Sequence, residues 1–409
     1  MTDNPAGLTV VGIGADGWAG LSGTATAALK AADVILGGDR QLALLPAEVT
    51  GERVPWPSPL LPALPGLLDE HRGRRIAVLA SGDPMFHGIG ATLSRLATTQ
   101  GTTAETLRVI PHPSSVSLAA ARLGWPLADV DVLSLVSAPV EELHLLVHPG
   151  RRILVLSRDA GTPALVAELL TGRGYGDSTL TVLAQLGGER ETTRTGPAAS
   201  LDLTGVDPLN VVAVECGRGG AARPLTPGLP DDAYDSDGQL TKREVRAVTL
   251  ALLGPQPGEL LWDVGAGSGS IAIEWMRSHR ACRAVAVESS PERAGRVEAN
   301  AAALGVPKLK VVVGRAPGGL AGLPAPDVVF IGGGVTRDGV VEAAWEALPA
   351  GGRLVANAVT LESEAVLAAW YAKLGGELTR VAVNRASPVG GFTGWRAMMP
   401  VTIWSVVKP

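Results

Sequence analysis

A glycine-rich stretch near the middle of the chain limits the possible folds more than any other feature. The apolar run 260–264 breaks into three alternating glycines, Gly265, Gly267 and Gly269, and a second apolar run, 271–276, has helical character. Together they predict a strand, a tight turn and the start of a helix. Glycines here let the backbone bend sharply and let a ligand approach the main chain where a Cβ atom would collide.

An acidic residue lies at an informative distance from this turn. Glu288 follows the apolar run 284–287 and comes 19 residues after Gly269. A carboxylate about 20 residues beyond such a turn is placed to accept hydrogen bonds from ribose hydroxyls. An ordinary strand–helix turn is the alternative. The strand, glycines, helix and acid in this register favour a nucleoside-containing cofactor.

The size and composition of the chain restrict its class. Its 409 residues exceed one ordinary hydrophobic core and predict two or three domains of about 150 residues each. With 46% apolar and 18% charged residues, the chain is expected to be folded α/β material and not disordered. The net charge of −5 supplies no basic footprint, so we do not expect nucleic acid as a partner.

Cysteine use and hydropathy indicate the compartment. Cys216 and Cys282 lie far apart and lack the spacing of a metal site, so we expect two buried, reduced thiols and no bound metal. The first residues lack the charged and apolar regions of a leader, and no run approaches about 18 uninterrupted apolar residues. We therefore expect a cytoplasmic protein that does not associate with membranes.

The first half alternates apolar runs with turn residues. Its strands are predicted over 8–14, 33–38 and 75–80. Ser22 or Thr24 is expected to cap a helix over 25–31. The proline-punctuated residues 55–65 are predicted to form a loop before a helix over 64–71.

The third of these strands runs into a turn that could meet a ligand. Its residues are Ser81-Gly82-Asp83-Pro84, and open α/β sheets bind ligands at the carboxyl ends of their strands. Gly82 can present bare backbone amides, and Pro84 stiffens the turn. An ordinary turn is the alternative, since each residue type is turn-prone. His87 is expected to be structural or solvent-facing.

Residues 217–238 differ in composition from both flanking regions. They are rich in glycine, proline and aspartate, which predicts an extended connector that buries little, with its acidic residues on solvated surface. After this segment, Thr241 and Glu244 have the spacing of a capping box. Ser290 is the expected N-cap of a helix that begins at Pro291.

The second half alternates strands and helices throughout. Strands after the central one are predicted over 309–313, 327–331 and 353–356, and two further runs, 379–384 and 401–407, close the sheet. No helix-length spacer separates these last two runs, and residues 384–400 between them are predicted to form a loop. The pattern predicts a doubly wound α/β domain with an antiparallel edge.

Several motifs of the first half resemble the tetrapyrrole (corrin/porphyrin) methyltransferase family over about residues 8–217. The motifs are Gly12-Ile13-Gly14, Ser81-Gly82-Asp83-Pro84, 113–119, 156–163 and 210–215. The resemblance implies two α/β lobes with a border near residue 110 and S-adenosylmethionine in the cleft between them. It also implies the following cofactor-side residues: Gly12, Gly14, Gly82, Asp83, Pro84, Met85, Ser114 and Ser115. Ala15-Asp16-Gly17 departs from the Gly-Pro-Gly of many members, which fits the branch acting on precorrin-6 and leaves the role of Asp16 open.

Motifs of the second half resemble class I precorrin methyltransferases that also decarboxylate, over about residues 238–407. They lie at 240–247, 263–269, 314–317 and 356–362. The resemblance implies a second S-adenosylmethionine held by the following residues: Thr241, Gly265, Ala266, Gly267, Ser268, Gly269, Glu288 and Ala316. Arg315 replaces the acid common in class I enzymes, so the adenine amine is expected to meet backbone near Ala316.

Together the resemblances imply an α/β chain with two catalytic parts. Residues 1–217 would form the two-lobed tetrapyrrole methylase fold, 218–237 a linker and 238–409 a Rossmann-like class I domain. The implied enzyme methylates a precorrin-6 type tetrapyrrole in cobalamin biosynthesis, at carbon 5 with its first half and carbon 15 with its second. The second half would also decarboxylate the ring C acetate, giving a precorrin-8. The alternatives are a two-domain methyltransferase for another tetrapyrrole, or a cofactor-binding scaffold or sensor with one inactive half.

The implied chemistry explains the absence of an acid–base constellation in the sequence. Methyl transfer from a sulfonium is an in-line displacement, in which the protein mainly positions the reactants. A precorrin carries carboxylates, so arginines should surround it. The candidate substrate-contacting or catalytic residues of the second half are Arg337, Asn357, Thr360, Glu362, Arg385 and Arg396. A surface arginine is the alternative for each of the three arginines. Glu362 could act in proton transfer, and a helix-start acid is its alternative. A structural role is likewise the alternative for Asn357 and Thr360. We expect a small-molecule tetrapyrrole as partner, and a homo-oligomer.

Overall fold

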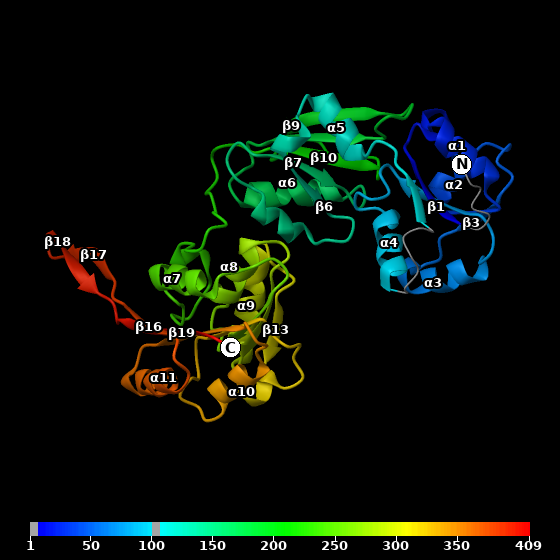
Figure 1. Cartoon of the computed structure of the whole chain (residues 1–409). Coiled ribbons are helices and arrows are strands. Elements are labelled where there is room, and N and C mark those ends of the chain that lie inside the picture. Colours follow the sequence, from blue (N-terminus) through cyan, green and yellow to red (C-terminus); the bar gives the residue numbers. More distant parts are fainter. Residues whose placement is uncertain (1–6, 100–106) are drawn as a thin grey trace. The chain divides into compact units, whose positions relative to one another are not determined.

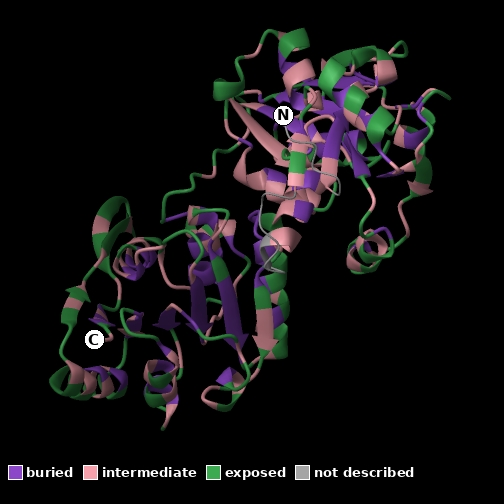
Figure 2. Cartoon of the chain, turned by 45° about the vertical axis from the view of Figure 1, so that its right-hand side comes forward, coloured by how far each residue is buried: buried purple, intermediate pink, exposed green. Residues whose placement is uncertain are grey.

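The computed structural model describes residues 7–99 and 107–409. The chain divides into two compact units (Figure 1). The first comprises Met1–Val140 and His148–Ala221, and the second comprises Glu141–Val147 and Ala222–Pro409. Figure 2 shows that buried residues concentrate in the strands while exposed residues lie on the outer faces of the helices. None of the described helices has the length and apolarity that a membrane-spanning segment requires.

The first unit begins with a five-stranded parallel sheet in the order β3-β2-β4-β1-β5. Its strands are β1 (Leu8–Ile13), β2 (Val34–Gly37), β3 (Glu52–Pro55), β4 (Ile76–Ser81) and β5 (Leu107–Ile110). Its helices are α1 (Gly23–Ala31), α2 (Asp39–Ala43), α3 (Leu60–Glu70) and α4 (Ile89–Thr99). Ile13 is paired with Ser81 in the β1–β4 register, so the turns that follow these two strands begin side by side.

A second sheet of the first unit has the order β6-β7-β10-β8-β9. Its strands are β6 (Val130–Ser134), β7 (Arg152–Leu156), β8 (Thr179–Ala184), β9 (Thr192–Pro197) and β10 (Asn210–Glu215), with α5 (Ser115–Leu123) and α6 (Thr162–Gly172). Only β6 and β7 pair in parallel among these strands. Val116 and Ala119 of α5 share a core with Leu154 and Leu183, so this helix belongs to the second sheet.

The second unit is built on a seven-stranded sheet in the order β13-β12-β11-β14-β15-β19-β16. Its strands are β11 (Leu260–Val264), β12 (Arg283–Glu288), β13 (Lys310–Val313), β14 (Val328–Ile331), β15 (Arg353–Ala358), β16 (Glu377–Val381) and β19 (Val401–Val407). Its helices are α7 (Arg243–Leu253), α8 (Ser270–Ser278), α9 (Pro291–Ala303), α10 (Val340–Ala347) and α11 (Leu361–Leu374). Strand β19 runs antiparallel to both neighbours, which confirms the predicted edge.

Both faces of this sheet are covered. Leu261 of β11 belongs to one buried cluster, while its neighbours Leu260 and Trp262 belong to another. Alternate side chains of one strand therefore enter cores on opposite faces, as a parallel sheet between two helix layers requires. The predicted α/β class is confirmed, with a Rossmann-like arrangement in the second unit.

Two stretches predicted as loops are wholly or partly regular structure. Helix α3 begins at Leu60, inside the predicted loop 55–65, because its apolar side chains Leu60, Leu64 and Leu67 pack on the sheet. The predicted loop 384–400 instead holds a hairpin of β17 (Asn384–Val389) and β18 (Phe392–Ala397). Figure 1 shows this hairpin reaching out beyond β16 and β19.

The predicted helix caps give a mixed result. Ser22 accepts a hydrogen bond from the Ala25 amide at 3.2 Å, and Ser290 caps α9 as predicted. The Thr241 cap is wrong, because α7 begins at Arg243 with Lys242 as N-cap. The Arg243 amide instead donates to a carboxylate oxygen of Asp231 at 2.9 Å.

The segment from Ala222 to Gly238 belongs to the second unit. Most of its residues are exposed, as predicted for a connector, but buried residues that the prediction did not include anchor it. Leu229 and Tyr234 are buried, and the Tyr234 hydroxyl donates to Glu274 at 2.8 Å. The same carboxylate accepts from Arg246, whose side chain is fully buried, at 2.6 Å. We call residues 222–238 the strap. Its acidic residues Asp232, Asp235 and Asp237 are exposed, as predicted, although Asp237 is also paired with Arg293 at 2.8 Å.

Candidate functional site

The glycine turn after β11 approaches three different neighbours. A Cβ atom at Gly265 would lie 2.8 Å from the Gly333 backbone, and one at Gly269 would lie 2.6 Å from a Val297 methyl carbon. At Gly267 it would meet the Gln239 carbonyl oxygen at 3.0 Å. All three glycines have φ between +61° and +78°, which side chains disfavour. The turn therefore presents bare main chain.

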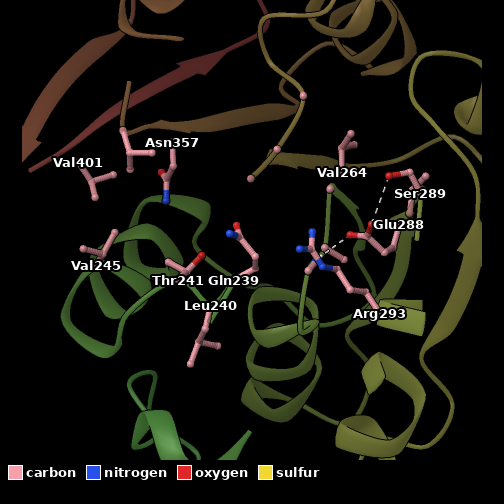
Figure 3. Close-up of a pocket in the computed structure, with 18 of the residues that line it drawn as sticks. Gln239, Leu240, Thr241, Val245, Val264, Glu288, Ser289, Arg293, Asn357 and Val401 are labelled. Atoms are coloured by element: carbon pink, nitrogen blue, oxygen red, sulfur yellow. Dashed lines mark hydrogen bonds between the residues drawn. The ribbon is translucent and has the colours of Figure 1, made fainter. Parts of the chain in front are cut away.

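Glu288, at the end of β12, lies beside this turn. Its carboxylate accepts hydrogen bonds from the Gly267 amide at 2.9 Å and from the Ser289 hydroxyl at 3.3 Å (Figure 3). It also accepts from the Ser290 amide at 2.9 Å. These bonds fix the carboxylate at the carboxyl edge of the sheet. A carboxylate has about four acceptor positions, so the group can still accept from a hydroxyl of a ligand. This arrangement fits the predicted ribose contact.

The turn and Glu288 line a cavity of about 550 Å³ in the second unit. Of the predicted cofactor residues, those that line it are Thr241, Gly265, Ala266, Gly267, Glu288 and Ala316. Ser268 and Gly269 are not among the lining residues. Ser268 is buried, and its carbonyl accepts from the Asn300 side chain at 3.0 Å.

The predicted substrate-side candidates separate into two groups. Arg337 and Asn357 line the cavity. Thr360 caps α11 by accepting from the Ser363 amide at 3.2 Å, and Glu362 is exposed in the first turn of that helix. Hydrogen bonds from the Glu362 amide and from Thr360 lower the pKa of the Glu362 carboxyl. These two residues are not among those that line the cavity.

The two hairpin arginines also lie outside the set that lines the cavity. Arg385 is paired with Glu244 and with Asp231, at 2.5 Å and 3.1 Å. The two carboxylates raise the pKa of the Arg385 guanidinium. Arg396 is exposed and stands directly opposite Arg385 in the hairpin register. Arg385 therefore fastens the hairpin to α7 and the strap.

Cations outnumber acids around the cavity. Lys242, Arg315 and Arg337 line it, and none of them has an acidic partner within the described part of the chain. A fourth cation, Arg293, is paired with Asp237. Glu288 is the one acidic side chain among the described lining residues. Sequence reasoning missed Lys242 and Arg315 as possible anion contacts. Their only signal in the sequence was their position within the motifs 240–247 and 314–317.

Asp263 is a buried acid that sequence reasoning did not single out. One carboxylate oxygen accepts from the Ala272 amide at 3.0 Å, which ties β11 to the start of α8. The other oxygen has no donor among the described residues. Burial raises the pKa of the Asp263 carboxyl to about 7. The position of this acid just before the glycine turn was its only signal in the sequence.

The first unit holds a cavity of about 560 Å³ lined by residues of both its sheets. Of the predicted residues, those that line it are Gly14, Gly82, Asp83, Ser114 and Ser115. Gly12, Pro84 and Met85 are not among them. A Cβ atom at Gly12 would lie 2.1 Å from the Gly82 carbonyl oxygen, so Gly12 is needed for close approach of the two turns. The Met85 amide donates to Asp83 at 2.9 Å and closes the second turn.

Two arginines of this cavity were missed by sequence reasoning. Arg40 donates to the Ser81 hydroxyl at 2.9 Å. Arg158 donates to the carbonyl oxygens of Leu135 and Ala138, at 3.2 Å and 3.1 Å. Both guanidinium groups thus use neutral acceptors for these bonds. Arg158 lies within the motif 156–163, but neither that motif nor the sequence around Arg40 marks an anion contact.

The structure gives Asp16 a neighbour. One of its carboxylate oxygens lies 3.2 Å from the His112 ring nitrogen Nε2. A Cβ atom at Gly14 would approach both groups, at 2.5 Å and 2.7 Å. The pair therefore packs against the turn after β1. His87, which was expected to be structural or solvent-facing, is exposed with φ of 55°.

The chain was compared with known protein families. The model for Tetrapyrrole (Corrin/Porphyrin) Methylases matches residues 7–202, and the model for the Precorrin methyltransferase domain matches residues 232–408. These matches confirm both resemblances drawn from the motifs.

Known relatives match either the whole chain or part of it. A protein from Sinorhizobium sp, named precorrin-6Y C(5,15)-methyltransferase (decarboxylating), is 51% identical over 404 residues, which cover 98% of this chain and 96% of that protein. A Pyrobaculum calidifontis protein, named probable cobalt-precorrin-6B C(15)-methyltransferase (decarboxylating), is 38% identical over 185 residues, 44% of this chain and 94% of its own. A solved structure also matches part of the chain. It is the crystal structure of the C-terminal domain of precorrin-6Y C5,15-methyltransferase from Rhodobacter capsulatus, whose sequence is 43% identical to this chain. The match covers 46% of this chain and all of that domain, with a TM-score of 0.43.

Proposed function

The chain belongs to the precorrin-6Y C(5,15)-methyltransferase (decarboxylating) family, and from this premise we propose that each of its two units binds one S-adenosylmethionine and methylates one carbon of a precorrin. The enzyme is an S-adenosylmethionine-dependent decarboxylating methyltransferase. The observation that supports two donor sites is that each unit has its own cavity beside a glycine turn. In each cavity the turn leaves the main chain open to a ligand.

The residues of the second cavity fit a nucleoside sulfonium. Gly267 leaves space at the turn, and Glu288 is fixed where ribose hydroxyls would lie. Ala316 follows β13, one strand farther along the sheet, where the adenine would meet backbone. The bound donor supplies an electrophilic methyl group. The protein contributes position, which can account for about 7–11 kcal/mol of a barrier.

We assign methylation at carbon 15 and decarboxylation to the second unit, and methylation at carbon 5 to the first. The Pyrobaculum relative is named for C(15) methylation and decarboxylation, and 44% of this chain covers nearly all of it. One half of a chain of this length can therefore hold both steps. The motifs of residues 238–407 resemble precorrin methyltransferases that also decarboxylate, which supports the second unit as that half.

The cations of the second cavity suit a substrate with several carboxylates. Lys242, Arg315 and Arg337 can pair with the acidic side chains of a precorrin. The acetate that is lost would lie away from them, against apolar side chains such as Val359 and Met398. Its carbon–carbon bond breaks, carbon dioxide leaves, and the electron pair enters the conjugated macrocycle. The substrate thus supplies the electron sink.

Two measurements on the intact chain test these proposals. Titration calorimetry should show two molecules of S-adenosylmethionine bound per chain. Mass spectrometry of the product from a precorrin-6 substrate should show a gain of two methyl groups and a loss of one carbon dioxide. A single donor bound at saturation, with one methyl group added at most, would favour a scaffold with one inactive half.

A further inference from the structure

Two side chains of α2 hold the Ser81 hydroxyl in one hydrogen-bonding role. Arg40 Nη2 donates to the Ser81 oxygen at 2.9 Å, and Gln41 Nε2 donates to it at 3.0 Å. The orientation of the Gln41 amide is fixed, because its oxygen Oε1 accepts at 2.8 Å from the Gly38 backbone amide, a group that can only donate. A hydroxyl oxygen has two acceptor positions, and both are filled here. The Ser81 proton is therefore available only for donation to a further group.

That proton has no acceptor among the residues that the structure describes. Ser81 ends β4, is exposed, and lines the cavity of the first unit. The cavity therefore contains a hydroxyl that donates and does not accept. A ligand with a hydrogen-bond acceptor would complement it.

The charge of Arg40 lies at the same place. Arg40 lines the cavity, and no carboxylate in the described part of the chain forms an ion pair with it. Desolvation lowers the pKa of the Arg40 guanidinium, and the charge of Asp207 raises it. The Asp207 carboxylate has other partners, since it accepts from Gln185 Nε2 at 2.9 Å and from the Leu209 amide at 2.8 Å. A carboxylate of a ligand could accept from both Arg40 and Ser81 in charge-assisted hydrogen bonds.

The pair lies on one side of the cavity. Arg40 follows β2, whereas two of the predicted donor-side residues, Gly14 and Ser114, follow β1 and β5. In this sheet β2 is separated from β1 by about 10 Å and from β5 by about 14 Å. The lining residues beyond β2 are Trp56, after β3, and Leu60, at the start of α3. Both belong to the apolar cluster of that sheet face.

An apolar wall next to a cation and a donating hydroxyl suits one ligand chemistry better than another. A precorrin has a broad apolar ring system with carboxylate side chains on its edge, so it can contact both the wall and the charged pair. The methyl donor also has a carboxylate, but an ammonium group stands next to that carboxylate. Arg40 would repel the ammonium. The macrocycle is therefore the favoured source of the carboxylate.

We infer that Arg40 and Ser81 together bind one carboxylate side chain of the precorrin in the first unit and so anchor one edge of the macrocycle. The inference rests on the proposed function of this unit. Arg40 and Ser81 are substrate-binding residues in this arrangement. Gln41 is a positioning residue, because it acts by filling the second acceptor position of the Ser81 hydroxyl.

The test measures methyl transfer to carbon 5 by the full chain, with saturating S-adenosylmethionine that carries an isotope-labelled methyl group and with NMR to locate the added methyl. Arg40→Gln should raise the KM for a precorrin-6 substrate about tenfold and leave kcat within about twofold, because the contact is the same in the ground and transition states. Arg40→Lys should recover part of the loss, since it keeps the charge without the planar fork. Arg108→Gln is the matched control: Arg108 is exposed on β5, does not line the cavity, and should leave the KM unchanged.

A double-variant cycle tests whether the two residues hold the same group. Ser81→Ala alone should raise the KM about threefold. Arg40→Gln combined with Ser81→Ala should raise it by less than the product of the two single effects, because one carboxylate bridges both side chains. Independent effects that multiply would overturn the shared contact.

Calorimetry with S-adenosylmethionine separates the two sources of the carboxylate. An unchanged donor affinity in Arg40→Gln, together with the raised KM for the precorrin, supports the inference. A lower donor affinity with an unchanged precorrin KM would assign the carboxylate to the donor, and no change in either would show that Arg40 binds neither ligand. Both of these results would overturn the inference and leave the proposed function standing. A native chain that adds no methyl group at carbon 5 would overturn the proposed function of the first unit, and this inference with it.

Discussion

Gly267 shows how one missing side chain can define a site. Its φ is +61°, and a Cβ atom there would meet the Gln239 carbonyl oxygen at 3.0 Å. Gly267→Val should therefore fill the space at the turn and lower the affinity of the second unit for S-adenosylmethionine by roughly 100-fold, or about 3 kcal/mol. Methylation at carbon 15 and release of carbon dioxide should be lost with it. Calorimetry and product mass spectrometry measure both effects.

The matched control for this change is Gly322→Val. Gly322 has a similar φ of +75°, but a Cβ atom there meets nothing within 4 Å. The backbone strain of a side chain with positive φ, roughly 1–2 kcal/mol, is thus common to both variants. If Gly322→Val also abolished carbon dioxide release, strain and not intrusion into the cavity would explain the Gly267 result.

Asp263 predicts a pH dependence of stability. Its pKa is about 7 in the folded chain and about 3.9 in an unfolded one, so the folded state holds an extra proton between these values. Stability should therefore fall as the pH rises from about 4 to about 7, by at most roughly 1.4 kcal/mol per pH unit from this group. Asp263→Asn should flatten the fall, and the exposed Asp338→Asn should not. Calorimetric melting near pH 5 and near pH 7.5 tests this.

Residue identity could be predicted where the backbone itself makes the site. Spacing alone singled out Gly265, Gly267 and Glu288, which line the cavity of the second unit, because a ligand that approaches bare main chain requires such residues at set intervals. Arg40, Lys242 and Arg315 could not be found in this way. A cation reaches a cavity through tertiary packing, and its neighbours in sequence do not record that packing.

At the scale of elements, the strap depends on one buried ion pair. Glu274 accepts from Arg246, from Tyr234 and from the Gly228 amide. Glu274→Gln would leave the fully buried Arg246 without its main countercharge, which should destabilise the second unit by about 3 kcal/mol. Limited proteolysis should then cut faster after Arg223 in the strap. The exposed Glu298→Gln on α9 is the control and should leave the cleavage rate unchanged.

We propose the β17–β18 hairpin as the interface of the homo-oligomer that was expected from the sequence. Phe392 and Trp395 are 85% and 79% exposed, which is unusual for two large apolar side chains on one short element. We expect the double change Phe392→Ser and Trp395→Ser to lower the sedimentation mass to that of one chain. Leu61→Ser, at an exposed leucine of α3, should leave the mass unchanged. An unchanged mass for the hairpin variant would remove the hairpin from the interface.

Elements were predictable where apolar periodicity continued and failed where it was interrupted. The prolines at 62 and 65 suggested a loop, yet α3 forms because its leucines have a core to pack on. The hairpin was missed because most of its side chains are exposed, so no buried face imposed an alternating pattern. The strap was missed because the partner of its buried tyrosine, Glu274, lies 40 residues away.

For the whole molecule, the presence of two methyltransferase units in one chain could be predicted from the sequence, because each unit has its own motifs. The first unit has one parallel sheet and one largely antiparallel sheet. The second unit has a doubly wound sheet. The pattern of apolar residues in each half reflects packing within that half only. The proposed assignment of one carbon to each half comes from the resemblances alone, since both cavities lie beside glycine turns and have similar volumes.

Gly82→Val is the counterpart of the Gly267 change in the first unit. Gly82 has φ of +59°, and a Cβ atom there would lie 3.1 Å from the Ser114 Cα atom, so a valine would intrude on the cavity that both residues line. One of two donor molecules should be lost, and the product should gain one methyl group while still losing carbon dioxide. Gly73→Val, with φ of +84° and nothing within 4 Å, is the control. If Gly82→Val also stopped carbon dioxide release, there would be two explanations. Either the assignment of carbons to units is reversed, or the second unit acts only after the first. A substrate already methylated at carbon 5 distinguishes them, because only in the second case would the variant release carbon dioxide from it.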